Sequence, residues 1–165
     1  MRLTTAVVAL LFAALISGCA SSLDEVPAGV TPPRIIVGTL EVPHMEATTM
    51  ALMSVIVRIQ VTNTDDEPLV VERLEITSVG RGPYELGRGE RRYQKELAPG
   101  TTEVFDLVVP AQAMDRAQAV GGQEGAMQIR VIGYFNSSVG RFRMMDMQSV
   151  ATSYSTSEGG VPGAS

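Results

Sequence analysis

The sequence predicts an all-β protein folded as an antiparallel sandwich of two sheets, with seven or eight strands and one short helix. Apolar residues occupy every second position from Met53 to Val61, which is the period of a strand with one buried face. Residues that favour turns interrupt similar runs at short intervals along the chain. Strand and helix patterns do not alternate regularly and no internal repeat is visible, which argues against a βαβ architecture.

Residues 34–40 form the first and weaker strand pattern, and residues 53–62 form the second. The sequence Asn-Thr-Asp-Asp-Glu-Pro at residues 63–68 ends the second strand, because Asn and Asp side chains bond their own backbone in turns. A strand resumes over residues 69–79. Its alternation changes face near Glu72-Arg73, which predicts a local irregularity of the bulge type.

The next corner begins at Gly80, and two short strands are expected around residues 84–86 and 91–97. Pro99-Gly100 predicts a turn. Residues 101–109 then alternate again, with apolar side chains on one face. These three segments add to the strands of the sandwich.

Residues 111–120 have helical rather than strand spacing. Pro110 suits the start of a helix and Gly121-Gly122 suits its end, so one short helix is expected here. Residues 127–135 and 141–150 alternate once more and are separated by turn-forming residues, which predicts a final hairpin.

Length, charge and cysteine count narrow the class of protein. The chain has 165 residues, enough for one domain, and a formal charge of −5. Its single Cys cannot form an intrachain disulfide, and one Cys with one His cannot supply the usual ligands of a structural zinc ion. The acidic balance argues against a nucleic-acid partner, because phosphate backbones are bound by an excess of Lys and Arg.

The N-terminus has the layout of a secretory signal. Arg2 precedes an apolar run over residues 3–16, which is shorter than the about 20 residues of a membrane-spanning helix. The run ends in Ile16-Ser17-Gly18-Cys19, which resembles the lipobox of bacterial lipoproteins. The resemblance implies cleavage between Gly18 and Cys19, and acylation of Cys19 with diacylglycerol and an N-acyl chain. We expect no other cofactor and no metal.

Two or more acyl chains would hold the protein stably to a membrane. Ala20 stands where enterobacterial lipoproteins kept at the inner membrane have Asp, so the resemblance favours the outer membrane, with the domain on its periplasmic face. The predicted organisation along the chain is a signal peptide at 1–18, an acylated tether at 19–33, a β-sandwich at 34–150 and a disordered tail at 151–165.

Residues 61–74 contain a strand, an Asn-rich turn and a second strand. Together with the Leu-Ala-Pro-Gly turn at 97–100, the strand end Val108-Val109-Pro110 and the hairpin at 134–142, this pattern resembles the WHy domain of late embryogenesis abundant type 2 proteins. The match spans residues 35–150. The resemblance implies an immunoglobulin-like sandwich of about seven strands and a non-enzymatic role linked to desiccation and other stress.

Few residues are arranged for catalysis or metal binding. His44 is the only imidazole and has no nucleophile motif, so we interpret it as a solvated loop residue and expect no catalytic residue. Asp65-Asp66-Glu67 lacks the ligand spacing of a calcium loop. A methionine cluster could bind copper(I), although core filling is the commoner use of this residue. The cluster consists of Met144, Met145 and Met147.

A cluster of cations stands out against the acidic average. It consists of Arg81, Arg88, Arg91, Arg92 and Lys95. One hypothesis is a contact site for anionic lipid headgroups, cell-wall polymer or an acidic partner. The other is a solvated hairpin in which neighbouring glutamates offset the charge. A phosphate loop is not indicated, because no helix begins here.

The leading functional hypothesis is therefore an outer-membrane lipoprotein with a non-enzymatic binding or structural sandwich, which has a protein partner in the envelope and a role linked to desiccation or envelope stress. An alternative is an accessory lipoprotein of an envelope or secretion machine. A third hypothesis, an envelope hydrolase, requires a carboxylate pair in a cleft, whereas the acidic residues fall mostly in turns or at outward strand positions.

Overall fold

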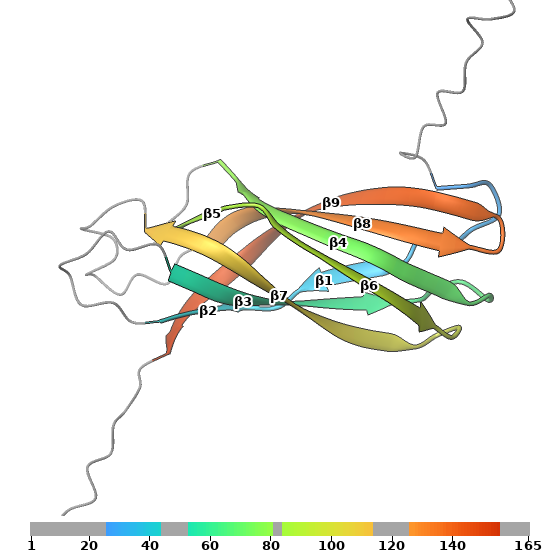
Figure 1. The fold of residues 1–165 in the computed structure, drawn as a ribbon, viewed down its shortest axis with the longest axis horizontal. Helices are drawn as coiled ribbons and strands as arrows, with labels where there is room; N and C mark the ends of the chain where they lie inside the picture. Colours follow the sequence, from blue (N-terminus) through green and yellow to red (C-terminus); the bar gives the residue numbers. More distant parts are fainter. Residues whose placement is uncertain (1–25, 44–52, 81–83, 114–125, 156–165) are drawn as a thin grey trace, which may run out of the picture.

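Nine strands form the described part of the chain, which in this computed structural model comprises residues 26–43, 53–80, 84–113 and 126–155. The strands build two sheets packed face to face in an elongated sandwich (Figure 1). The predicted all-β sandwich is thus confirmed. No helix of the described residues is long and apolar enough to cross a membrane.

The first sheet has four strands in the order β1-β3-β7-β5. All of its neighbouring strands are antiparallel. Its long central pair is β3 and β7, and the two edge strands are short. The bounds are β1 Arg34–Val37, β3 Met53–Thr62, β7 Thr102–Ala113 and β5 Tyr84–Leu86.

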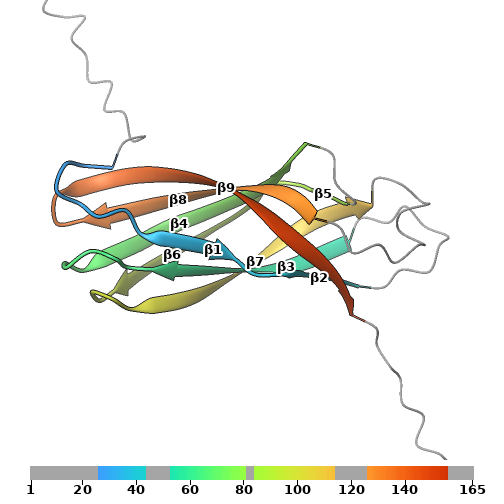
Figure 2. The ribbon, with the colours of Figure 1, turned by 180° about the vertical axis from the view of Figure 1, so that it is seen from behind.

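The second sheet has five strands in the order β2-β9-β8-β4-β6. Its pairs are antiparallel except β2 with β9, which is parallel. Figure 2 shows β2 beside the end of β9 from the opposite side of the molecule. The bounds are β2 Leu40–Pro43, β9 Gly140–Ser155, β8 Ala126–Ser137, β4 Leu69–Val79 and β6 Gly89–Leu97.

Alternation places every second side chain of the long strands between the sheets. Val57, Ile59 and Val61 of β3 have no exposed surface, and neither do Ile129 and Val131 of β8. At the end of the core near the β8–β9 turn, the rings of Phe135 and Phe142 stack with centroids 5.3 Å apart. Burial of these side chains from both sheets supplies the main driving force for folding.

The weak strand expected at residues 34–40 is two strands in different sheets. The Gly38 N–H donates to the Arg58 carbonyl oxygen at 2.9 Å, and beyond this bond the chain leaves β3. It then crosses to the other sheet, where Leu40 lies opposite Thr152 of β9. The crossing gives the first strand pattern two short halves, which explains its weakness in the sequence.

The helix expected at residues 111–120 does not begin where predicted, because β7 continues through Pro110 to Ala113. Pro110 lies opposite Ser54 of β3, and its carbonyl oxygen accepts a hydrogen bond from Gly87 at 2.8 Å, just after β5 ends. The missing N–H of proline is tolerated where the neighbouring strand stops. The rest of the predicted helix lies outside the described residues.

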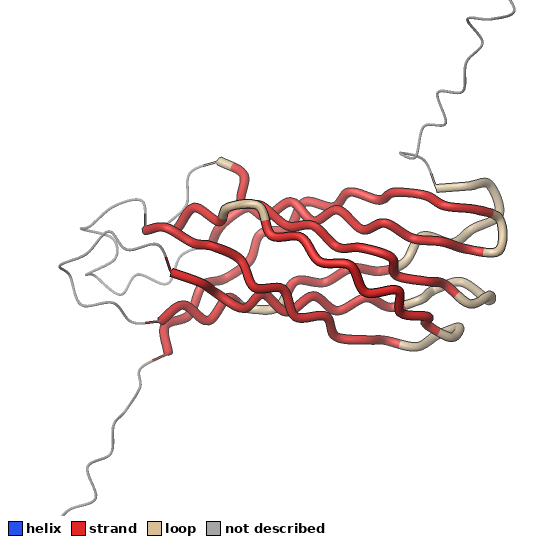
Figure 3. Tube along the Cα trace, in the orientation of Figure 1, coloured by secondary structure: helices blue, strands red, loops and turns tan. Residues whose placement is uncertain are grey.

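Both flanks of the predicted domain are longer than expected. Strand β9 continues to Ser155, so 151–155 belongs to the sheet rather than to a disordered tail, and Thr152 is buried there. The end of the predicted tether also belongs to the domain, because Val26 and Val30 pack against the core. Figure 3 shows the two additions at opposite ends of the sandwich, residues 151–155 as strand and the N-terminal segment as loop.

Candidate functional site

A bulge in β4 determines which side chains reach the outer face of the five-stranded sheet. The register of β4 shifts between Val71 and Arg73 against both of its neighbours, β6 and β8, which confirms the irregularity expected there. A bulge adds one residue to a strand and therefore reverses the faces that follow. Arg73 and Glu75 consequently lie on the outer face, while Leu74 between them is fully buried in the core.

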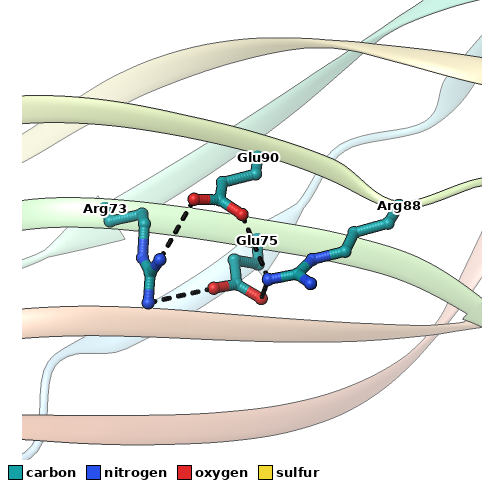
Figure 4. A network of polar contacts seen from close by, with 4 residues as sticks. All are labelled: Arg73, Glu75, Arg88 and Glu90. Atoms are coloured by element: carbon teal, nitrogen blue, oxygen red, sulfur yellow. Dashed lines mark hydrogen bonds and ion pairs between the residues drawn. The ribbon is translucent and has the colours of Figure 1, made fainter.

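Four charged side chains form a compact network on this outer face (Figure 4). Arg73 Nη1 donates to Glu90 at 3.0 Å and Arg73 Nη2 lies 3.1 Å from Glu75 Oε1. Arg88 Nη2 donates to Glu75 at 2.9 Å and to Glu90 at 3.1 Å. Glu75 and Glu90 occupy opposed positions on β4 and β6, so each arginine bridges the same two carboxylates.

Glu75 is the buried member of the network, with 7% of its surface exposed. Its Oε1 is buried and has no hydrogen-bond partner, although Arg73 Nη2 is close enough for charge attraction. Removing a carboxylate from water is costly unless cations compensate for it. The two guanidinium groups provide that compensation, and Glu75 in turn keeps both of them in place.

Arg73 also stacks on an aromatic ring of the next strand, with its guanidinium carbon 3.8 Å from the centre of the Tyr134 ring. Burial acts to lower the pKa of Arg73, but its hydrogen bond to Glu90 and its attraction to Tyr134, Glu75 and Glu90 outweigh burial, so the pKa is raised. Arg73 is therefore held as a permanent cation. Its stacking on Tyr134 adds a cation–π attraction to the two ion pairs.

Next to the network the outer face is hollowed into a depression with a volume of about 310 Å³. We call it the arginine-lined depression. Strands β4 and β8 form its floor, and the segment before β6 and strand β9 contribute to its sides. Its lining residues are Glu75, Ile76, Thr77, Arg88, Arg130, Ile132, Tyr134 and Arg143.

The lining combines positive charge with an apolar floor. It contains three arginines and one glutamate, a formal charge of +2, in a chain whose overall charge is −5. Adding Arg73 and Glu90 leaves that local sum unchanged, because they cancel. Arg130 has no ion-pair partner among the residues that the structure describes. Guanidinium groups above Ile132 and Tyr134 are suited to a carboxylate or phosphate next to an apolar group.

The structure divides the cation cluster that the sequence singled out. Arg91 and Lys95 turn toward the other sheet, where Arg91 donates to the Asp106 carbonyl oxygen at 3.2 Å and Lys95 pairs with Glu103 at 3.3 Å. Arg88 belongs to the depression, and Arg92 lies opposite Arg73 on β4. Arg81 lies outside the described residues. Alternation along β6 separates cations that are adjacent in sequence.

Sequence reasoning missed the cations that complete the site. Arg130 and Arg143 are 13 residues apart and lie on neighbouring strands, where Tyr134 is directly opposite Arg143. The sequence could have indicated both arginines, because they occupy outward-facing positions of strands in which apolar and polar residues alternate. Sequence proximity favoured the segment before and within β6, whereas the depression is lined by side chains of three strands, β4, β8 and β9, and by Arg88 from the segment before β6.

The acidic turn at residues 63–68 makes hydrogen bonds to the N-terminal segment of the domain. Asp65 Oδ2 accepts a hydrogen bond from the Thr31 backbone at 2.8 Å, and Asp65 Oδ1 accepts one from Asp66 at 2.7 Å. Thr64 Oγ1 donates to the Pro32 carbonyl oxygen at 2.7 Å. The turn therefore holds the N-terminal segment. Within the described ranges no group of three or more His, Cys, Asp or Glu could hold a metal ion.

The methionines do not behave as one group. Met144 packs against the core, as the core-filling interpretation expects, but Met145 and Met147 are exposed on the outer face of β9. That interpretation is wrong for these two, because β9 is exposed on the face opposite the core. His44, Gly18 and Cys19 lie outside the described residues, so their predicted roles stay predictions.

The fold and the site together define a β-sandwich with a basic, partly apolar depression on one outer face. No family model matches the chain, and no curated protein matches it. Solved structures that match the chain include a protein from Arabidopsis thaliana, with 14% identity and a TM-score of 0.47, covering 81% of this chain and 93% of that one. A late embryogenesis abundant protein has 15% identity and a TM-score of 0.44, with 91% and 86% covered. A protein from Archaeoglobus fulgidus has 9% identity and a TM-score of 0.41, with 74% and 95% covered.

Proposed function

We propose that this protein is a lipid-anchored binding module of the bacterial envelope, which binds an anionic envelope component in the arginine-lined depression without transforming it. The observation that carries the proposal is the local charge of +2 around an apolar floor in an acidic chain. A positive cleft in a negative protein attracts anions to one place and repels them elsewhere. The two carboxylates near the depression are both bound by arginines and serve to position them.

The anchor in this proposal is Cys19, and the docked N-terminal segment gives it a direction. Six residues lie between Cys19 and Val26, so the two Cα atoms are at most about 25 Å apart when the chain is extended. Residues 26–33 lie along the end of the sandwich that contains the β3–β4 and β8–β9 turns (Figure 1). An acylated Cys19 would therefore keep that end near the membrane and leave the depression on the side of the upright sandwich.

Binding is tested with two probes that present different anions. One is a fluorescent poly-glutamate peptide, and the other is a vesicle containing phosphatidylglycerol. We expect at least one probe to bind, with an affinity that falls as salt increases. Replacing Arg130 and Arg143 together by Glu should abolish binding, whereas Arg34→Glu with Arg58→Glu changes the total charge equally on the other sheet and should leave it unchanged. Failure of both probes, or equal effects of the two double variants, would overturn the proposed site.

The anchor is tested separately by cell fractionation. Cys19→Ala should leave the signal peptide uncleaved and the protein unacylated. Ala20→Asp is the matched variant, which keeps acylation and should move the protein to the inner membrane in a host that uses the Asp retention signal. Normal outer-membrane fractionation of Cys19→Ala would contradict the proposed anchor. A deletion strain exposed to drying and osmotic stress tests the stress role that the WHy resemblance implies.

A further inference from the structure

The outer face of the four-stranded sheet carries large apolar side chains in exposed positions. Val108 and Val104 of β7 are 64% and 53% exposed, and Ile56 of β3 is 56% exposed. Ile36 of β1 is 36% exposed and extends the same face. Several large apolar side chains exposed on one sheet face indicate a contact surface.

The register of β3 and β7 arranges this face in three rows. In the middle row, Arg58 lies opposite Asp106, with Nε 3.5 Å from Oδ1. The row on one side pairs Ile56 with Val108, and the row on the other side pairs Gln60 with Val104. An exposed ion pair is thus framed by apolar side chains. Its two charges lie on different strands at the same height along the sheet.

This arrangement is complementary to itself. Consider a two-fold axis that lies in front of this face, parallel to the strands and midway between β3 and β7. The axis brings a second copy face to face with the first and places Arg58 of one copy over Asp106 of the other. It also places Ile56 over Val108 of the second copy, and Gln60 over Val104. In such an isologous contact each pairing occurs twice.

The same axis keeps both copies pointing in one direction. Because it runs parallel to the strands, the two N-terminal segments lie at the same end of the pair. Both chains could then be anchored in one membrane, a step that rests on the acylation of Cys19 proposed above. A face-to-face contact with the strands reversed would place the two segments at opposite ends.

We infer that the outer face of the four-stranded sheet binds a second copy of this chain through the contact just described. The size of the face predicts a weak dimer in solution. Strands β3 and β7 have 10 and 12 residues and the edge strands β1 and β5 have 4 and 3, so the face covers roughly 450–500 Å², which is below the ~800 Å² per partner of a standard stable interface. Confinement of both copies to one membrane raises their effective concentration and favours the pair.

The test uses full-length chains with two different C-terminal tags, coexpressed, crosslinked in the membrane and purified through one tag. Wild-type copies should copurify. Two copies of Arg58→Asp should not, and neither should two copies of Asp106→Arg, with a decrease of at least roughly tenfold because like charges then face each other across the contact. Coexpressing Arg58→Asp with Asp106→Arg should restore copurification, since each Asp then faces an Arg.

The comparison among the three variant combinations controls for folding, because the Arg58–Asp106 ion pair within each chain is lost in all three. A second comparison controls for hydrophobicity. Val108→Lys should abolish copurification, whereas Val139→Lys, at a residue that is 60% exposed in the β8–β9 turn, should not. Absence of copurification for the wild type, or equal behaviour of the like-charged and mixed combinations, would overturn the dimer. Neither result depends on the arginine-lined depression.

Discussion

The amide of Asn63 donates a hydrogen bond to the carbonyl oxygen of Leu97 at 3.0 Å, and so joins the end of β3 in one sheet to the end of β6 in the other. The same Nδ2 donates to the Glu67 carbonyl oxygen at 2.8 Å, and Oδ1 accepts from the Asp65 backbone at 3.0 Å. The side chain is completely buried. One residue therefore closes its own turn and holds two sheets together.

Asn63→Ala is expected to decrease the free energy of unfolding by about 2–4 kcal/mol, because the carbonyl oxygens of Glu67 and Leu97 lose a donor in a buried position. Urea unfolding of the wild type and variant measures the loss. The control is Thr64→Ala, the next residue, whose exposed hydroxyl makes one hydrogen bond and should contribute less than about 1 kcal/mol. Similar losses for both variants would contradict the role of Asn63.

Glu75→Ala should decrease the free energy of unfolding by roughly 2–4 kcal/mol, because it leaves Arg73 and Arg88 without their buried anion. Glu90→Ala removes the exposed carboxylate of the same network and should cost under about 1 kcal/mol. Urea unfolding at low and high salt distinguishes the two contributions, since salt strongly screens the exposed ion pairs of Glu90 but not the buried ones of Glu75. A cost of Glu75→Ala no greater than that of Glu90→Ala would show that burial does not matter here.

The raised pKa of Tyr93 predicts that the protein loses stability at alkaline pH. Burial raises the pKa of its phenol above the ordinary value of 10.0, and nearby Asp106 adds to this effect while Arg91 opposes it. The unfolded state therefore releases the proton first, so the stabilisation is complete below about pH 10 and is lost as the pH rises through the folded-state pKa. Unfolding in urea at neutral and alkaline pH measures the decrease.

Tyr93→Phe should make the stability curve flatter in this alkaline range. The variant should also lose about 1 kcal/mol at neutral pH, because the hydroxyl donates to the Asp106 carbonyl oxygen at 2.9 Å. The edge contact with the Phe105 ring remains, since both rings are kept. An alkaline decrease as steep in Tyr93→Phe as in the wild type would assign it to another group.

Gly133→Ala should be destabilising by about 1–3 kcal/mol, because a Cβ at this position would overlap the Phe135 ring. That ring is fully buried and stacked on Phe142, so it cannot move aside easily. Gly38→Ala is the matched control, where the nearest atom would be 3.6 Å away and a change within about 0.5 kcal/mol is expected. Thermal unfolding compares the two variants, and equal midpoints would refute the tight contact.

Alternation alone predicted most strands and the irregularity at Glu72-Arg73, because the period of two is a local property of an extended chain with one buried face. It also identified the turn at residues 63–68, where Asn and Asp make short-range hydrogen bonds. The boundaries were less predictable. Strand β9 continues through a Ser- and Thr-rich stretch because β2 pairs with it, and β2 exists as a separate strand only because the chain crosses between sheets.

The candidate site depended on information that the sequence lacks. Five cations within 15 residues suggested one basic patch, yet β6 directs Arg91 and Lys95 away from the face that holds Arg88. The sheet instead brings Arg130 and Arg143 beside Arg88 from other strands. By itself the sequence determined the fold class, through short-range periodicity and turn chemistry. Only the tertiary structure decided which charges meet, because the order of strands in a sheet is set by long-range pairing.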